Sequence, residues 1–378
     1  MITRTVYRED HEMFRATVRR FAERECLPRQ AKWDADGCVD RETWLKAGRE
    51  GLLCTSLPEE YGGGGGDFGH CAVLIEELAA ANVSGPGFAL HSDIIAPYIQ
   101  RLGTEEQKRR WLPRCASGEC ILAIAMSEPG AGSDLKAIRT TAVRQGDDYV
   151  INGSKTFISN GLNCDLVVVV AKTDPAAGAK GVSLFLVEAD RPGFKKGRKL
   201  DKIGLVAADT AELFFDEVRV PAANLLGELN KGFIHLMQEL AQERFIIAVG
   251  AASTMEAMLA ETIRYTRERK LFGQSVFDFQ NSKFKLAELK AKATAMRIMV
   301  DYYLAEHLRR KLTVEEAAIA KLFTTETMCA GLDDMLQLHG GYGYMTEYPI
   351  ARAYVNARVS RIYGGTSEVM KELISRGL

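Results

Sequence analysis

Residues 165–174 read DLVVVVAKTD, a short run of β-branched residues that ends in a polar turn. Valine packs well on a pleated surface, so the run predicts a buried β-strand. Similar runs lie on both sides of it: ILAIAM (121–126), GVSLFLVEAD (181–190) and AELFFDEVRVP (211–221). Because several short strands occur without a long helix between them, residues 121–227 are predicted to form an antiparallel β-barrel or sandwich.

The regions on either side of these strands have a helical period. Capping-box patterns are present at TEEQ (104–107) and TVEE (313–316), where the first residue can bond the helix start and the last can bond back. Long helices are predicted near 229–266, 278–309 and 314–338, and their short connections favour a bundle. The expected fold is mainly α with a central β domain, divided into domains at 1–120, 121–227 and 228–378.

Composition limits the class of protein and of partner. Lys and Arg number 49 and Asp and Glu 50 in 378 residues, a balance that argues against nucleic acid as a partner. The eight cysteines show no C-x-x-C motif and no histidine at zinc spacing, so reduced thiols and no metal site are expected. With a charged N-terminus and no apolar run long enough to span a bilayer, we expect a soluble cytoplasmic protein. In a eukaryote, after processing, the same chain would belong in the mitochondrial matrix.

A glycine run, GGGGG (62–66), needs separate treatment. Together with DFG it satisfies G-x-G-x-x-G through Gly64, Gly66 and Gly69, the spacing of dinucleotide-binding turns. The run follows LPEEY (57–61) rather than a strand, and no strand–helix–strand unit surrounds it. A mobile loop is therefore favoured over a Rossmann turn.

Five motifs combine small residues with polar side chains. AMSEPGAGSD (125–134) can offer backbone N–H groups and hydroxyls to a flat polar ligand, although alone it could be a tight turn. In IYGGTSEVM (362–370), Thr366 or Ser367 can cap the following helix. The other motifs are GSKTFISN (153–160), RKLFGQSVFDFQ (269–280) and QLHGGYGY (337–344).

These five motifs, in this order, resemble the acyl-CoA dehydrogenase family over essentially the whole chain. The resemblance implies an N-terminal helical domain, a middle β domain and a C-terminal four-helix bundle, with FAD at the domain junction. The implied reaction is dehydrogenation of a fatty acyl-CoA between its α and β carbons.

Matching motif by motif, the resemblance implies which residues bind the cofactor and substrate. Ser127 and Ser159 would contact the flavin ring, with Phe157 beside it where many members have tryptophan. Ser133 would touch the CoA part of the substrate. The FAD pyrophosphate and adenosine would be bound by a group that a neighbouring subunit supplies in this family: Arg269, Phe272, Gln280, Gln337 and Gly341. Thr366 and Glu368 match the adenylate end, although several members have glutamine in place of Glu368.

The catalytic base is the main departure from the common pattern, because many members carry a glutamate where this chain has Gly364. Glu243 offers an alternative: it lies on an apolar stripe of one helix, among Leu236, Leu240, Ile247 and Ala251. A carboxylate on an apolar face either pairs with an arginine in the bundle or acts as a base.

A branch that includes long-chain acyl-CoA and isovaleryl-CoA dehydrogenases carries its base on this helix. The QER motif (242–244) and the Gly364–Gly365 pair resemble that branch, which implies Glu243 as base and Arg244 as a CoA contact. The backbone N–H of Gly364 can still bind the thioester oxygen. His339, in a glycine-rich loop, is interpreted as structural.

The expected function is FAD-dependent oxidation of a medium to long straight-chain acyl-CoA, with electrons passed to an electron-transfer flavoprotein. Alternatives are a branched-chain (isovaleryl) dehydrogenase, an acyl-CoA oxidase, and a catalytically silent acyl-CoA-binding protein. A homo-oligomer, a dimer of dimers, is expected because one subunit would hold half of each cofactor site.

Overall fold

The computed structural model describes residues 3–378. The N-terminal part consists of six α-helices with two short π-helical segments, Ala22–Cys26 and Leu90–Ile95. The α-helices are α1 (Glu9–Phe21), α2 (Gln30–Asp36), α3 (Arg41–Arg49), α4 (Phe68–Ala80), α5 (Ala96–Leu102) and α6 (Glu105–Ala116). The capping box predicted at Thr104 is confirmed, with the Gln107 backbone N–H donating to the Thr104 hydroxyl at 3.2 Å.

The middle region is one eight-stranded sheet in the order β6-β7-β3-β2-β4-β5-β8, with β1 added beside β4. The strands are β1 (Leu122–Ala125), β2 (Thr141–Gln145), β3 (Asp148–Ser159), β4 (Leu166–Lys172), β5 (Val182–Glu188), β6 (Phe194–Lys199), β7 (Thr210–Pro221) and β8 (Leu225–Leu226). The sheet is mixed rather than wholly antiparallel, because β1 and β2 both pair in parallel with β4. The opening valine run is β4, and its side chains are buried on both faces.

The C-terminal part contains the three long helices that the sequence predicts. They are α7 (Gly232–Glu268), α8 (Gln280–Leu308) and α9 (Val314–His339), followed by α10 (Pro349–Ala357) and α11 (Ser367–Ser375). A small hairpin of β9 (Lys270–Leu271) and β10 (Gln274–Ser275) joins α7 to α8. Thr313 and Thr366 cap α9 and α11 as expected, by accepting N–H bonds from Glu316 and Val369.

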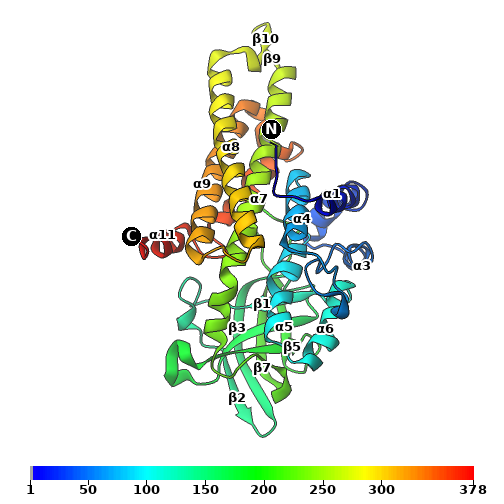
Figure 1. The fold of residues 1–378 in the computed structure, drawn as a ribbon, viewed down its shortest axis with the longest axis vertical. Helices are drawn as coiled ribbons and strands as arrows, with labels where there is room; N and C mark the ends of the chain where they lie inside the picture. The colour runs from blue at the N-terminus through cyan, green and yellow to red at the C-terminus, as the bar shows by residue number, and fades with distance from the viewer. Residues whose placement is uncertain (1–2) are drawn as a thin grey trace.

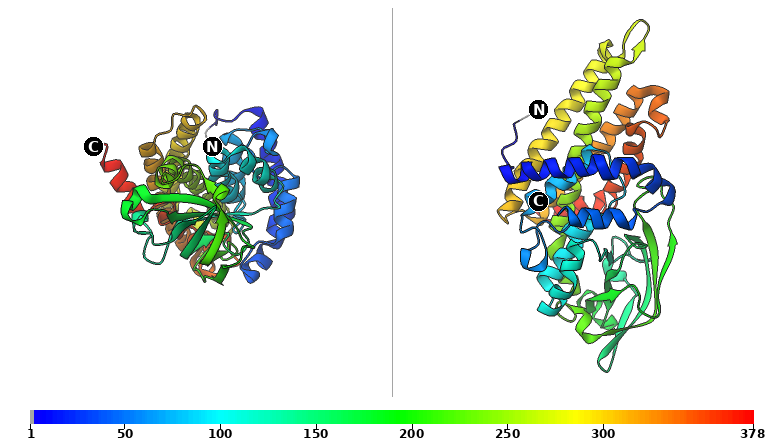
Figure 2. Two further views of the ribbon diagram at one scale, coloured as in Figure 1. Left: turned by 90° about the horizontal axis from the view of Figure 1, so that it is seen from below. Right: turned by 90° about the vertical axis from the view of Figure 1, so that its right-hand side faces the viewer.

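Helix α7 contacts all three parts of the molecule. It runs from the sheet, at the lower end of Figure 1, into the bundle and ends at the β9–β10 hairpin at the opposite end. Helix α4 of the N-terminal part packs against α7, and α1 crosses the outside of the bundle (Figure 2). A shared apolar core of α4, α7, α8 and α9 includes Phe68, Phe245, Met255, Leu289 and Leu332. Elements far apart in the chain therefore meet around α7.

By length and composition, α7 could cross a membrane, with a mean hydropathy of 1.4 over an 18-residue window. Within residues 3–378 it is the one helix of that kind, and 56% of the window is buried inside the protein. Its apolar side chains pack against neighbouring helices, so its composition is that of a bundle core helix.

The glycine run is tightly bonded rather than loose. All five glycines donate their backbone N–H groups to carbonyls of residues 54–59. A Cβ at Gly63 would lie 2.3 Å from the carbonyl oxygen of Leu57, so only glycine fits there. The expectation of a mobile loop is therefore not supported, because the chain packs against its own backbone.

Candidate active site

Glu243 lies in the middle of α7 and is almost fully buried, with 7% of its surface exposed. The hydroxyl of Tyr98, on α5, donates a hydrogen bond of 2.9 Å to Oε1 of Glu243. Burial raises the pKa of Glu243 to about 7, the Tyr98 bond opposes that rise, and the nearby carboxylate of Glu239 adds to it. An arginine partner, the alternative interpretation of this carboxylate, is wrong: the hydrogen-bond partner is a tyrosine.

The stripe around Glu243 is confirmed only in part. Leu236 and Ala251 are buried, whereas Leu240 and Ile247 are half-buried. Ile247 stands one turn after Glu243 and faces the loop that contains Gly364, since a Cβ built on Gly364 would lie 2.6 Å from its Cδ1 atom. The structure therefore brings Gly364 to the same side of α7 as Glu243.

Two buried cations accompany this carboxylate. Arg244 is 5% exposed, and its Nε atom has no hydrogen-bond partner within residues 3–378. Lys321 on α9 is fully buried and donates to the carbonyl of Gly365. Burial and the charge of Arg244 lower the pKa of Lys321 to about 8. The unpartnered guanidinium nitrogen makes Arg244 a candidate for an anionic group of a ligand.

The loop after β1 and the C-terminal end of strand β3 are bonded to each other. The hydroxyl of Ser127 donates to the Thr156 carbonyl at 2.6 Å, and the Thr156 N–H donates back to the Ser127 carbonyl at 3.0 Å. Below them, Lys155 and Glu128 form a buried ion pair of 2.9 Å. The AMSEPGAGSD and GSKTFISN motifs thus form one rigid unit.

Phe157 lies at the rim of this unit with its ring 70% exposed. Its φ is +59°, in the left-handed region, and it falls in a bulge where the pairing of β3 with β7 shifts register. Strained backbone and an outward-facing aromatic ring are typical of a functional site. Ser159, two residues on, is exposed on the same strand.

A groove of about 420 Å³ lies between the first loop and α11. Its lining includes Ser133 together with Thr366 and Glu368, three residues that the sequence analysis assigned to substrate or cofactor binding. Gly130 and Gly132 in the same loop face open space, because a built Cβ would meet no atom within 4 Å. The loop therefore lets a ligand approach its backbone. The exposed ring of Phe157 follows Thr156, which is bonded to this loop at Ser127, and an aromatic ring next to hydroxyls and open backbone fits the flat, polar flavin of FAD.

The remaining predicted cofactor residues lie elsewhere. Arg269 and Phe272 belong to the β9–β10 hairpin, and the Arg269 guanidinium lies 5.4 Å from the ring centre of Tyr342. This end of the bundle is the one farthest from the sheet (Figure 1). Arg269, Phe272, Gln280, Gln337 and Gly341 are all exposed. Within one chain, these residues do not meet Ser127 and Phe157.

His339 fits the structural interpretation. It is 3% exposed, its ring stacks on Tyr265 with centroids 4.2 Å apart, and its Nδ1 lies 2.9 Å from the carbonyl oxygen of Met335. Burial lowers its pKa. These contacts account for the side chain without any chemistry.

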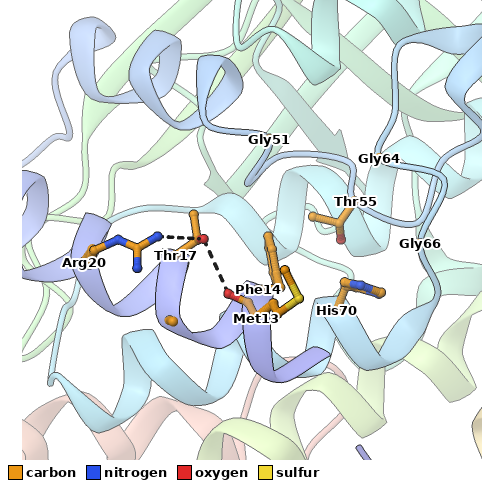
Figure 3. A pocket seen from close by; sticks show the side chains of 10 residues that line it. Met13, Phe14, Thr17, Arg20, Gly51, Thr55, Gly64, Gly66 and His70 are labelled. Carbon is orange, nitrogen blue, oxygen red and sulfur yellow. Dashed lines mark hydrogen bonds between the residues drawn. The ribbon is translucent and has the colours of Figure 1, made fainter. Parts of the chain in front are cut away.

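A second hollow, of about 570 Å³, lies between α1 and the glycine run (Figure 3). His70 lines it, and the potential ligand atoms of Asp10, His11 and His70 lie within 4.8 Å of one another. However, Nδ1 of each ring accepts a backbone N–H, from Arg8 at 3.1 Å and from Asp67 at 3.3 Å. A histidine that binds a metal through Nε2 carries its proton on Nδ1, so these rings are helix caps rather than metal ligands.

Sequence reasoning missed three residues of the site. Tyr98 follows a proline in an ordinary helix start, Lys321 reads as a surface lysine of an amphipathic helix, and Lys155 alternates with apolar residues on a strand. Their burial results from packing between elements that are distant in the chain. No local signal identifies them.

Comparisons with known proteins identify the family. Three domain families match in order: acyl-CoA dehydrogenase N-terminal domain at residues 8–119, middle domain at 123–218 and C-terminal domain at 230–378. The chain belongs to the acyl-CoA dehydrogenase family.

Individual relatives are similar over nearly the whole chain. Long-chain specific acyl-CoA dehydrogenase of Sus scrofa mitochondria is 52% identical, over 99% of this chain and 87% of the relative. The crystal structure of acyl-CoA dehydrogenase from Geobacillus kaustophilus has a TM-score of 0.97 at 49% identity, with 99% of each chain covered.

Two further solved structures concern the cofactor and the electron acceptor. A glutaryl-CoA dehydrogenase from Mycobacterium smegmatis in complex with FADH2 has a TM-score of 0.91 at 30% identity, covering 98% of this chain and 95% of that one. A chain from a study of the electron transferring flavoprotein of Acidaminococcus fermentans has a TM-score of 0.93 at 38% identity, covering 98% of each chain.

Proposed function

We propose that this enzyme catalyses FAD-dependent α,β-dehydrogenation of a fatty acyl-CoA, giving the trans-2-enoyl-CoA, with Glu243 as its base. The observation that carries the proposal is a buried carboxylate with a pKa raised to about 7, on the helix whose next turn, at Ile247, contacts the Gly364 loop. When bound, FAD supplies the oxidant that accepts the hydride from the β-carbon.

The α-proton of a thioester is only weakly acidic, so its acceptor must be close and must be more basic than an exposed carboxylate. Burial gives Glu243 that basicity. Tyr98 occupies Oε1, and no side chain of residues 3–378 donates to Oε2. We assign Oε2 as the atom that takes the α-proton.

Other residues of the chain bind and orient the substrate in this proposal. The N–H of Gly364 forms no backbone hydrogen bond in the described structure and can donate to the thioester oxygen as negative charge develops. Arg244 and Ser133 bind the CoA part. Ser127, Phe157 and Ser159 bind the flavin ring, and Thr366 and Glu368, in the groove beside α11, bind the adenylate end of the cofactor.

We also propose that the substrate is a straight acyl chain of medium to long length, as the similarity to the long-chain relative supports. The electron acceptor is an electron-transfer flavoprotein. Anaerobic bleaching of the flavin by a panel of acyl-CoA esters, including isovaleryl-CoA, ranks the substrates. Reoxidation by O₂ compared with the flavoprotein distinguishes dehydrogenase from oxidase, and an absence of bleaching by every ester would indicate a silent binding protein.

The proposed working unit is a homo-oligomer, a dimer of dimers, in which the bundle end of one chain completes the FAD site of another. The exposed group at that end supports it: Arg269, Phe272, Gln280, Gln337 and Gly341. The proposed domain limits are 1–120, 121–227 and 228–378, which fall in the connections before β1 and before α7. We place the enzyme in solution, in the cytoplasm or the mitochondrial matrix.

The test is Glu243→Gln, which keeps size and hydrogen bonding but cannot accept a proton. Flavin reduction by acyl-CoA should fall by roughly 10²–10⁴-fold in anaerobic stopped-flow mixing, the loss typical of a missing general base. Bound FAD and acyl-CoA should be retained. Glu256→Gln is the matched control, because Glu256 lies on the same helix but pairs with Arg297. Parent-rate reduction in Glu243→Gln would place the base elsewhere.

A further inference from the structure

Among the side chains of residues 3–378, Tyr98 is the one that hydrogen-bonds the proposed base. Its ring is fully buried, and its hydroxyl ends 2.9 Å from Oε1 of Glu243, a residue 145 positions later in the chain. α5 and α7 come from different domains, so this bond ties the N-terminal helices to the base. A buried phenol needs an acceptor, and here the acceptor is the carboxylate itself.

The bond has a fixed direction over the working pH range. Burial and the Glu243 charge raise the pKa of Tyr98 well above its ordinary value, so the phenol keeps its proton and remains the donor. A hydrogen bond to a charged acceptor is stronger than one to a neutral acceptor. The phenol therefore favours the ionised carboxylate over the protonated acid, and it fixes the plane in which Oε2 lies.

We propose that Tyr98 is a positioning residue for the reaction: it orients the Glu243 carboxyl with Oε2 free and keeps that group ready to accept the α-proton. This inference rests on the proposed role of Glu243. In the proton transfer, the C–H bond of the α-carbon breaks and an O–H bond forms at Oε2. The Tyr98 proton stays on its own oxygen, and Oε1 becomes the carbonyl oxygen of the neutral acid.

The charged groups that act on Glu243 besides Tyr98 are Glu239 and Arg244, and other titratable groups lie on the elements packed against this part of α7. On α7 itself, Glu239 pairs with Arg101 of α5 at 2.6 Å, and Arg244 follows directly in the chain. The neighbouring Gln242 contacts the backbone carbonyl of Asp93, from the segment Leu90–Ile95, and the ring of His307 on α8. Lys321 of α9 lies near Arg244, whose charge acts on it. Of these side chains, Tyr98 is the one that hydrogen-bonds the Glu243 carboxylate.

The experiment removes only the hydroxyl, in Tyr98→Phe. In the parent, the acid limb of the flavin-reduction rate should lie near pH 7, the pKa of Glu243. In Tyr98→Phe it should move upward by about one to two pH units, because the lost bond to a charged group stabilised the ionised form. Tyr61→Phe is the matched control, because its hydroxyl bonds the carboxylate of Glu105 at 3.0 Å and not that of Glu243. Its acid limb should coincide with that of the parent.

A second variant and a second readout keep the test independent of folding losses. Site-specific 3-fluorotyrosine at position 98 is a stronger donor of almost the same shape, so it should move the limb downward. Infrared titration of the protonated carboxyl band, assigned by its loss in Glu243→Gln, should show the same shifts without turnover.

The outcomes separate the two claims. An unmoved limb and an unmoved carboxyl band in both Tyr98 variants would reduce Tyr98 to a packing residue and overturn the inference, with Glu243 still the base. Parent-rate flavin reduction in Glu243→Gln would instead overturn the proposed function.

Discussion

At position 364 the absence of a side chain allows a left-handed backbone and close packing of Ile247 from α7. Gly364 and Gly365 have φ values of +63° and +97°, in the left-handed region. A residue with a Cβ pays roughly 1–2 kcal/mol there. At 364 its Cβ would also come within 2.6 Å of Ile247 Cδ1. The space that a glutamate at 364 would need is therefore filled by the side chain one turn from Glu243.

Moving the catalytic base from position 243 to position 364 should require a glutamate at 364 and also a smaller side chain at 247. We expect Glu243→Gln with Gly364→Glu to stay nearly as slow as Glu243→Gln alone, because Ile247 blocks the new side chain. Adding Ile247→Ala should recover roughly tenfold or more in flavin reduction, a fraction of what a general base supplies. The rate of flavin reduction by acyl-CoA, measured by stopped flow, compares the single, double and triple variants.

The control for this rescue is Gly364→Gln in the same background, which adds equal bulk without a base and should recover nothing. Recovery by Gly364→Glu with Ile247 intact would show that packing against α7 is not the barrier.

At the scale of elements, the rigid unit formed by the Ser127 loop and the end of strand β3 depends on one buried ion pair. Lys155 is fully buried on β3, and burial lowers its pKa to about 8 while Glu128 acts to raise it. Its ammonium donates to the Met126 carbonyl at 3.0 Å as well as to Glu128. Glu128 also accepts the backbone N–H groups of Arg139 and Thr140. The bonds of Lys155 and Glu128 therefore fix the loop that carries Ser127 and Ser133.

Glu128→Gln should leave a buried ammonium without its counter-charge. The expected cost is about 3–5 kcal/mol in free energy of unfolding, the range for breaking a buried pair, along with weaker retention of FAD. Urea titration and flavin content after gel filtration measure the two effects.

Glu212→Gln serves as the comparison, since Glu212 pairs with the exposed Arg198 at 3.8 Å in the same sheet. It should cost at most about 1 kcal/mol. If both variants lost the same small amount, the buried pair would not anchor the loop.

At the scale of the whole molecule, one chain presents the two halves of the predicted cofactor site on separate surfaces. Phe272, at the tip of the β9–β10 hairpin, is 89% exposed with φ of +50°. A strained, exposed aromatic ring at a hairpin tip is typical of a contact with another surface. This arrangement is consistent with a homo-oligomer in which the hairpin tip contacts a second copy of the chain.

Phe272→Asp should weaken assembly and FAD binding together. We expect the parent to sediment as a dimer or larger, and the variant to shift toward monomer with roughly tenfold or greater loss of FAD affinity, at least about 1.4 kcal/mol. Val143→Asp, at an exposed apolar residue of β2, should change neither property. A parent that is monomeric yet binds FAD tightly would contradict the proposal.

The glycine run illustrates why sequence alone misjudges some segments. A run of five glycines occurs both in mobile loops and in segments that pack closely against neighbouring backbone, and the sequence does not distinguish the two. In this protein, hydrogen bonds from all five N–H groups decide for the second case. The register of those bonds depends on residues 54–59, whose path is set by packing in the N-terminal helices.

The sequence by itself determined the order helices, strands, helices, the caps at Thr104, Thr313 and Thr366, the five site motifs, and a carboxylate on the apolar face of a long helix. Each of these depends on side chains within a few residues of one another, where period and propensity act directly. Only the tertiary structure decided that Tyr98 holds Glu243, that Lys321 holds Gly365, and that β1 pairs in parallel with β4. These contacts join residues far apart in the chain. They follow from which buried surfaces fit together, and no local pattern records that.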